Sequence, residues 1–169
     1  AFIILSIIFW FILDNLKIHK FKNRLPQSFL RIFLFLIILQ IILGAFLAGL
    51  NGGLLYNTWP DMNGSVIPND IIIKDLFLLE SSNNPSVIQF YHRIIGYLIV
   101  FFLFFLNYLF FKNNFTYKSL VILDVAIFLQ VLIGIITLIT GVKIVYASLH
   151  QLGSILVLTS FLFIFYKNC

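Results

Sequence analysis

Two histidines stand within long apolar stretches of this sequence, where an ionisable side chain is costly and usually serves a function. His92 and His150 each lie about six residues into such a stretch, which is about 9 Å along an α-helix. Both stretches are expected to run from the outside inward, so the two imidazoles should lie at similar depth. If their helices face each other in a bundle, the two rings can share one ligand.

Haem iron suits such a pair, because it accepts an axial ligand on each face. Zinc or copper would normally need further His, Cys or carboxylate ligands, and the neighbouring stretches offer none. The alternative is that each histidine forms a helix–helix hydrogen bond or lies at the level of the lipid headgroups. For two histidines at matched depth we favour haem, whereas His19 lies in a basic loop and is expected to be solvated.

Other polar and small residues accompany the two histidines. Arg93 directly follows His92, and its guanidinium would either pair with haem propionates or extend toward lipid headgroups. Gln40 and Gln130 lie within apolar stretches, where we expect helix–helix hydrogen bonds. Small residues beside the histidines would let a flat macrocycle approach the backbone, and these are Gly96, Ala147, Gly153 and Ser154.

The composition indicates which solvent surrounds these residues. Of the 169 residues, 62% are hydrophobic and 10% are charged, and the mean hydropathy is +1.08. A soluble domain has about 25% charged residues, so lipid is expected around most of this chain. The net charge of +5 does not predict nucleic-acid binding, because the basic residues gather in short loops rather than on one folded face. Cys169, the one cysteine, cannot form an intramolecular disulfide.

Four continuous apolar runs are long enough to cross a hydrocarbon core about 30 Å thick. Barrel strands would be about 10 residues long with alternating polarity, so these runs predict helices. We therefore predict an all-α membrane protein, a four-helix transmembrane bundle with a partial N-terminal span. The four spans are expected at residues 29–50, 87–111, 119–140 and 144–166.

The remaining segments complete the predicted organisation. Residues 1–13 begin without a methionine or a basic n-region, so they are interpreted as a truncated membrane segment rather than a signal peptide. The basic loop at 14–31 then lies inside, and the haem-binding four-helix domain covers 32–166. Lysine and arginine gather in segments on one side of the membrane, so the positive-inside rule places the long loop at 51–86 outside. The histidines then lie near the outer face.

The outer loop is expected to have structure of its own. Its first part is rich in Gly, Asn and Pro, which predicts turns. Its second part, from residue 71, has apolar residues near helical spacing and is too short to cross, so we expect an amphipathic segment at the membrane surface. The loop also holds Lys74, Asp75 and Glu80. Asp124, in the third span, is expected at the inner interface.

The four spans show an internal repeat. Gln40 is followed four residues later by a glycine, and Gln130 is followed by a glycine at the same spacing. Each glutamine span precedes a histidine span, so the sequence predicts two copies of one helical hairpin. Parallel repeats of this kind are related by an axis along the membrane normal.

These motifs together resemble the haem A synthase family, in its mitochondrial and alphaproteobacterial type. The resemblance covers most of residues 32–166 in order. It is carried by GAFLAGLNGGLLYNTWPDMNG at 44–64, IP at 67–68, VIQFYHRIIGY at 87–97, LQVLIGIITLITGV at 129–142 and LHQLGSILVLT at 149–159.

The resemblance implies a function. The family has two four-helix halves and oxidises the C8 methyl group of haem O to the formyl group of haem A for cytochrome oxidase. This chain is similar to the C-terminal half, which implies haem b with His92 and His150 as axial ligands and iron as the metal. It also implies a bacterial plasma membrane or a mitochondrial inner membrane. Haem O synthase, cytochrome oxidase assembly factors and a second copy of the chain are the protein partners that it suggests, with no electron donor identified.

Two positions depart from the family pattern. Gln89 stands where the N-terminal half has a glutamate three residues before its first ligand, and an amide cannot act as that carboxylate. Lys143 stands where a proline is expected. The helices that would hold the substrate haem are expected in the other half, so catalysis by this chain alone is not predicted.

Two other functions stay open at this point. The first is a bis-histidine b-type cytochrome that only passes electrons, and the second is a membrane structural or transport protein without haem. The motif YNTWPDMNG favours the synthase, because an electron carrier does not need such a loop. The chain has no dinucleotide or P-loop motif, so any reductant must come from a partner.

Overall fold

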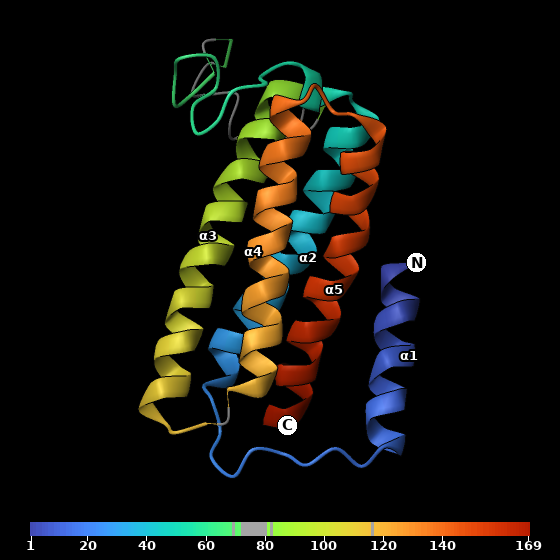
Figure 1. The fold of residues 1–169 in the computed structure, drawn as a ribbon, viewed down its shortest axis with the longest axis vertical. Coiled ribbons are helices and arrows are strands. Elements are labelled where there is room, and N and C mark those ends of the chain that lie inside the picture. Colours follow the sequence, from blue (N-terminus) through green and yellow to red (C-terminus); the bar gives the residue numbers. More distant parts are fainter. Residues whose placement is uncertain (69, 72–80, 82, 116) are drawn as a thin grey trace.

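The computed structural model describes the whole chain except residues 69, 72–80, 82 and 116, and the described part is helical (Figure 1). Four of its helices are long and apolar enough to cross a membrane, which confirms the predicted all-α membrane fold. The elements in order are α1 (Phe2–Asn15), α2 (Gln27–Gly49), the 3-10 turn η1 (Gly52–Leu54), α3 (Pro85–Lys112), α4 (Lys118–Ile139) and α5 (Ile144–Asn168).

The four long helices form two hairpins, as the repeat predicts. Helix α2 packs along α3, and α4 packs along α5. Contacts of α3 with α4 and of α2 with α5 close the bundle, so α3 and α5 lie diagonally across it (Figure 1). The short apolar helix α1 packs against α5 on the outside of the bundle (Figure 1).

The hydrophobic core fills the inner half of the bundle, away from the two histidines. Its largest fully buried side chains are Phe33, Phe110 and Phe161, which come from α2, α3 and α5. The rings of Phe33 and Phe161 are 4.8 Å apart between centroids. Dense apolar packing is therefore concentrated at one end, and the two histidines lie toward the other.

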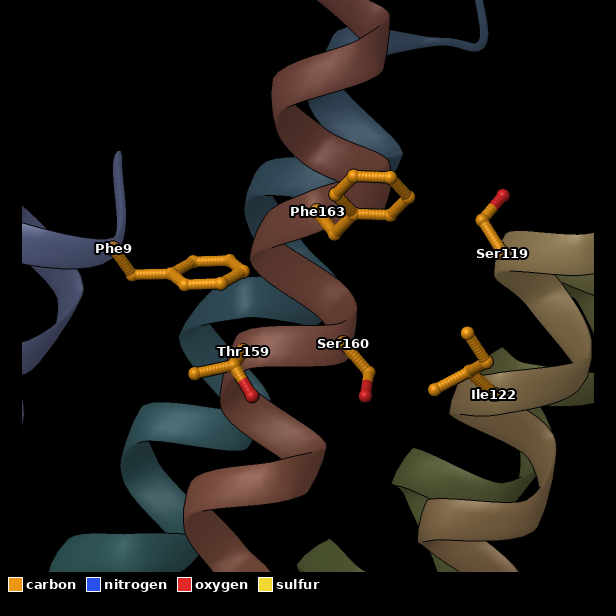
Figure 2. Close-up of a pocket in the computed structure, with 6 residues that line it drawn as sticks. All are labelled: Phe9, Ser119, Ile122, Thr159, Ser160 and Phe163. Carbon is orange, nitrogen blue, oxygen red and sulfur yellow. The ribbon is translucent and has the colours of Figure 1, made fainter. Parts of the chain in front are cut away.

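Polar pairs also join the helices near the inner end. The Asn107 side chain in α3 donates to the Asp124 carboxylate in α4 over 2.8 Å, so the half-buried Asp124 links the two hairpins. A groove of about 240 Å³ lies among α1, α4 and α5 in this half of the bundle (Figure 2). It is lined by Phe9, Ser119, Ile122, Thr159, Ser160 and Phe163. This groove is remote from both histidines, so it is separate from the predicted cofactor site.

The described part of the outer loop folds over the end of the bundle where α3 begins (Figure 1). The Met62 and Ser65 backbones pair across a tight turn in which Asn63 and Gly64 have φ of 55° and 88°. Positive φ at both central positions is the geometry of a hairpin turn that favours Asn-Gly. The amphipathic segment predicted from residue 71, with Lys74, Asp75 and Glu80, falls largely outside the described residues.

The basic segment before α2 caps the C-terminal end of α5. The carbonyl groups in the last turn of a helix have no partner within the helix. Here Lys20 Nζ donates to the Tyr166 carbonyl over 2.8 Å, and the Phe21 amide donates to the Lys167 carbonyl over 2.8 Å. The fully buried Asn168 side chain accepts from the Leu25 amide over 2.6 Å and donates to the Leu25 carbonyl over 3.2 Å.

We expect Asn168→Ala to lower the free energy of unfolding by about 1–3 kcal/mol, because it leaves two buried backbone groups of Leu25 without partners. Unfolding in detergent, followed by circular dichroism during titration with a denaturing detergent, measures the change. Asn113→Ala is the matched control, because among the described residues the Asn113 side chain bonds only to the Leu109 carbonyl of the helix that it follows. Equal stability of the two variants would show that the cap is not stabilising.

Candidate functional site

The structure brings the two predicted ligand residues together. His92 in α3 and His150 in α5 point into the outer half of the bundle from diagonally placed helices. Their ring centroids are 6.4 Å apart, and the ring planes are inclined at 71°. The expectation from their matched depth, that the imidazoles face each other, therefore agrees with the structure.

The two imidazoles fit the donor set of an axial haem pair. The Nδ1 atom of each ring is buried and has no hydrogen-bond partner, which is unusual for a buried polar atom. Two imidazole nitrogens at about 2 Å on opposite sides of one metal ion would place the ring centres about 6 Å apart. Within the described part of the chain, no three His, Cys, Asp or Glu side chains gather as a typical zinc or copper site requires.

Glycines on the partner helices make room for the two rings. A Cβ at Gly44 in α2 would lie 3.3 Å from His92 Cε1, and a Cβ at Gly134 in α4 would lie 2.8 Å from His150 Cε1. Each ring therefore packs directly against the backbone of the other helix in its hairpin. The glycine of the Gln-x-x-x-Gly repeat has a steric role that spacing alone did not reveal.

The glutamines of the repeat form the predicted helix–helix hydrogen bonds. Gln40 Nε2 lies 3.1 Å from His92 Nε2, and Gln130 Nε2 donates to the His150 carbonyl over 2.7 Å. We predicted that glycines after the histidines leave room for a macrocycle, and here the structure differs. The space beside Gly96 is next to the Gln40 amide, and a Cβ at Gly153 would overlap the Gln130 side chain.

Arg93 holds the outer loop, a role that the sequence analysis missed. Its Nη1 donates to the Asp61 carbonyl over 2.7 Å, and its Nη2 donates to the Tyr56 carbonyl over 3.0 Å. Gln89, one helical turn earlier, donates to the same Tyr56 carbonyl over 2.9 Å. The spacing of four residues between Gln89 and Arg93 indicates a shared helix face, but not what that face contacts. Pairing of Arg93 with haem propionates stays a prediction, and its Nε is buried without a partner.

Hydrogen bonds within the loop keep it close to the site. The Asn57 side chain donates to the Leu138 carbonyl at the end of α4 over 2.9 Å, which ties the loop to the second hairpin. Thr58 Oγ1 donates to the Asp61 carboxylate over 2.6 Å and accepts from the Asn63 amide over 2.7 Å. The motif YNTWPDMN is thus a folded cap that joins both hairpins at the outer end of the bundle.

The Asp70 carboxylate also holds the outer loop in place. The hydroxyl groups of Tyr56 and Ser86 both donate to Asp70, the latter over 2.6 Å. Partial burial by itself would raise the pKa of Asp70, but the hydrogen bonds from Ser86 and Tyr56 lower it below its ordinary value. Burial, followed by the bond to Asp70, raises the pKa of the Tyr56 hydroxyl. The contact is therefore intact at neutral pH.

Comparisons with known proteins identify relatives over nearly the whole chain. The COX15-CtaA family model, described as cytochrome oxidase assembly protein, matches residues 1–162. The chain is 58% identical over 168 residues to a haem A synthase of Pelagibacter ubique, a match that covers 99% of this chain and 50% of the relative. It is 36% identical over 170 residues to a haem A synthase of Rickettsia africae, covering 94% of this chain and 49% of the relative.

The extent of these matches matters as much as their identity. A haem A synthase of a Wolbachia from Brugia malayi is 32% identical over 151 residues, which cover 86% of this chain and 44% of the relative. The chain thus spans about half the length of the curated relatives that it matches, or slightly less. No solved structure matches the chain.

We expect Gln89→Glu to lower the free energy that holds the outer loop against the bundle by about 1–3 kcal/mol. A carboxylate cannot donate to the Tyr56 carbonyl, and it would draw Arg93 away from that carbonyl. In a Trp10→Phe background, acrylamide quenching of Trp59 fluorescence measures the change. Gln151→Glu is the matched control, since Gln151 is exposed on α5. The loop assignment is wrong if both variants quench like the parent protein.

The hydrogen bonds to Asp70 predict that the stability of the outer loop depends on pH. Because the pKa of Asp70 is lower in the folded loop than its ordinary value, its contribution to loop stability is present above about pH 4 and is lost as the pH falls through the folded pKa. Trp59 fluorescence in the same background should therefore change on acidification below about pH 4. Asp70→Asn should lack this step, and an unchanged step in that variant would assign it to another group.

Proposed function

This chain belongs to the COX15-CtaA family of cytochrome oxidase assembly proteins, and on that premise we propose that it binds haem b between His92 and His150 as part of a haem A synthase. The observation that carries the proposal is the pair of imidazoles 6.4 Å apart, each with a buried Nδ1 that has no partner. The four apolar spans and the relatives support an integral membrane protein.

Some residues of this chain would hold haem, and others shape the surroundings of the two imidazoles. When bound between two axial imidazoles, haem would supply electron transfer, because no coordination position stays open for a substrate. Gly44 and Gly134 provide the space that each ring occupies. Arg93 secures the loop above the site, and its unpaired Nε supports a further contact with a propionate.

We propose that the longer protein represented by the relatives oxidises the C8 methyl group of haem O to the formyl group of haem A. The present chain would contribute the haem b half, which would correspond to the C-terminal half of those relatives. Gln89 supports this division, because its amide donates to the Tyr56 carbonyl and an ionised glutamate could not. The reacting methyl group would then be held by residues outside this chain.

A second function uses the same site. A bis-histidine b-type cytochrome that only passes electrons would need the two ligands and no catalytic carboxylate, and Gln89 in place of glutamate favours it. The folded YNTWPDMN cap favours the synthase, since it is built on many contacts that haem retention by itself does not require. Conversion of haem O to haem A by the longer protein described above would favour the synthase over the electron carrier.

The bacterial relatives favour the bacterial plasma membrane as the location, with the haem site near its outer face. Cytochrome oxidase assembly factors and haem O synthase are the partners that the family suggests, and they stay proposals, as does a homo-oligomer. The electron donor would be a separate protein or a membrane carrier.

The chain in detergent, titrated with haem, should give the spectrum of six-coordinate low-spin haem b in its oxidised and reduced forms. His92→Ala and His150→Ala should each convert this spectrum to high spin or abolish binding, because one axial ligand is lost. His19→Ala is the matched control, since His19 is exposed and remote from the site. Optical absorption and electron paramagnetic resonance measure the outcome.

The proposal fails if a folded chain, shown to be helical by circular dichroism, binds no low-spin haem. It also fails if the low-spin spectrum survives both ligand variants unchanged, because haem would then be held elsewhere.

A further inference from the structure

We propose that the groove among α1, α4 and α5 holds an acyl chain of an anionic phospholipid, whose headgroup phosphate pairs with Lys167 at the inner end of the groove. This site is separate from the two histidines, and the argument for it does not depend on haem. The lipid would fill the space that protein side chains leave between α1 and the bundle.

The groove has the lining and the length of an acyl-chain site. Its volume is about 240 Å³, and three helices contribute to its walls (Figure 2). A second groove of about 390 Å³ shares Phe9 and Thr159 with it and continues between α1 and α5, where its other lining residues are apolar side chains of α1. The two grooves thus adjoin along α5. A hydrocarbon chain, which has no polar atoms, suits this lining.

Lys167 places a positive charge at the inner end of the groove. Its Nζ atom is 5.6 Å from the ring centroid of Phe163, which lines the groove, and 4.6 Å from the ring centroid of Phe21. The Lys167 side chain is half-buried, yet among the described residues its ammonium has neither a hydrogen-bond acceptor nor a carboxylate partner. Aromatic faces attract a cation but carry no net charge, so an anion is the partner that this ammonium would bind most strongly.

The surroundings of Lys167 favour an anionic headgroup over a zwitterionic one. Lys118 begins α4 directly before Ser119, which lies at the level of Phe163 in the groove (Figure 2). The Ser119 hydroxyl is buried without a partner among the described residues. The nearby carboxylate of Asp14 interacts with the Tyr166 hydroxyl rather than with Lys167. Lysines gathered beside a membrane span attract anionic lipids, because the charges are complementary.

Trp10 is a built-in reporter for this site. It follows Phe9 of the groove, and its ring centroid lies 5.0 Å from that of Tyr166 and 6.2 Å from that of Phe165 in α5. Brominated acyl chains quench tryptophan fluorescence only at short range. In a Trp59→Phe background, the chain in phosphatidylcholine bilayers is therefore titrated with brominated phosphatidylglycerol or with brominated phosphatidylcholine.

Brominated phosphatidylglycerol should quench Trp10 with a relative binding constant about 5-fold higher than that of brominated phosphatidylcholine, the effect expected for one lysine near a membrane surface. Trp59 in a Trp10→Phe background is the control reporter, because it lies in the outer loop. It should show no such preference.

Two pairs of variants test the headgroup and the acyl chain separately. Lys167→Gln should remove the preference for phosphatidylglycerol, and Lys112→Gln should keep it, although each lysine stands in the last turn of its helix. Ile122→Phe should weaken quenching by both lipids, because the larger ring occupies the groove. Val121→Phe is its matched control, since Val121 is similarly exposed but does not line the groove.

Several results would overturn the lipid site. Equal quenching of Trp10 by the two lipids, or a preference that survives Lys167→Gln, rules out the paired headgroup. Quenching that Ile122→Phe leaves unchanged rules out an acyl chain in the groove. Absence of quenching by either lipid would show that protein covers this face instead. Failure of the chain to bind haem would leave the lipid site intact, because neither the residues nor the measurement involve the histidines.

Discussion

Hydrocarbon offers no hydrogen-bond partners, so every polar group in the spans of this protein must be satisfied by the protein itself or left unpaired at a cost. The backbone meets this constraint by forming helices. The side chains meet it between helices, as Asn107 of α3 does with Asp124 of α4 and as Gln130 of α4 does with the His150 carbonyl of α5. Apart from Ser119 Oγ at the inner end of α4, the described buried side-chain atoms without a partner lie toward the outer half, and the Nδ1 atoms of His92 and His150 are among them.

The uneven distribution of packing along the bundle follows from the same constraint. The inner half holds the aromatic core, whereas the outer half holds histidines, glutamines and the glycines that accommodate them. A bundle packed tightly along its whole length would have no place for a cofactor between diagonal helices. The stability of the fold thus comes mainly from one end, which leaves the other end free to hold polar groups.

The outer loop closes that polar end. Its contacts come from both hairpins: Arg93 and Gln89 from α3, and the Leu138 carbonyl from α4. These hydrogen bonds hold the loop at the outer end of the bundle, the end toward which the two imidazoles lie. Arg93, which directly follows His92, therefore shapes this end of the bundle through the loop.

The sequence by itself determined the helical spans, their pairing into hairpins and the depth of His92 and His150. These features depend on hydropathy and on the rise per residue, which are local properties of the chain. Only the tertiary structure decided that Arg93 binds loop carbonyls, that Gln40 reaches a ring while Gln130 reaches a carbonyl, and that Gly44 and Gly134 make room for the imidazoles. Each of these contacts joins residues far apart in sequence, and their pairing depends on how neighbouring helices rotate and where the loop folds, which no spacing within one segment specifies.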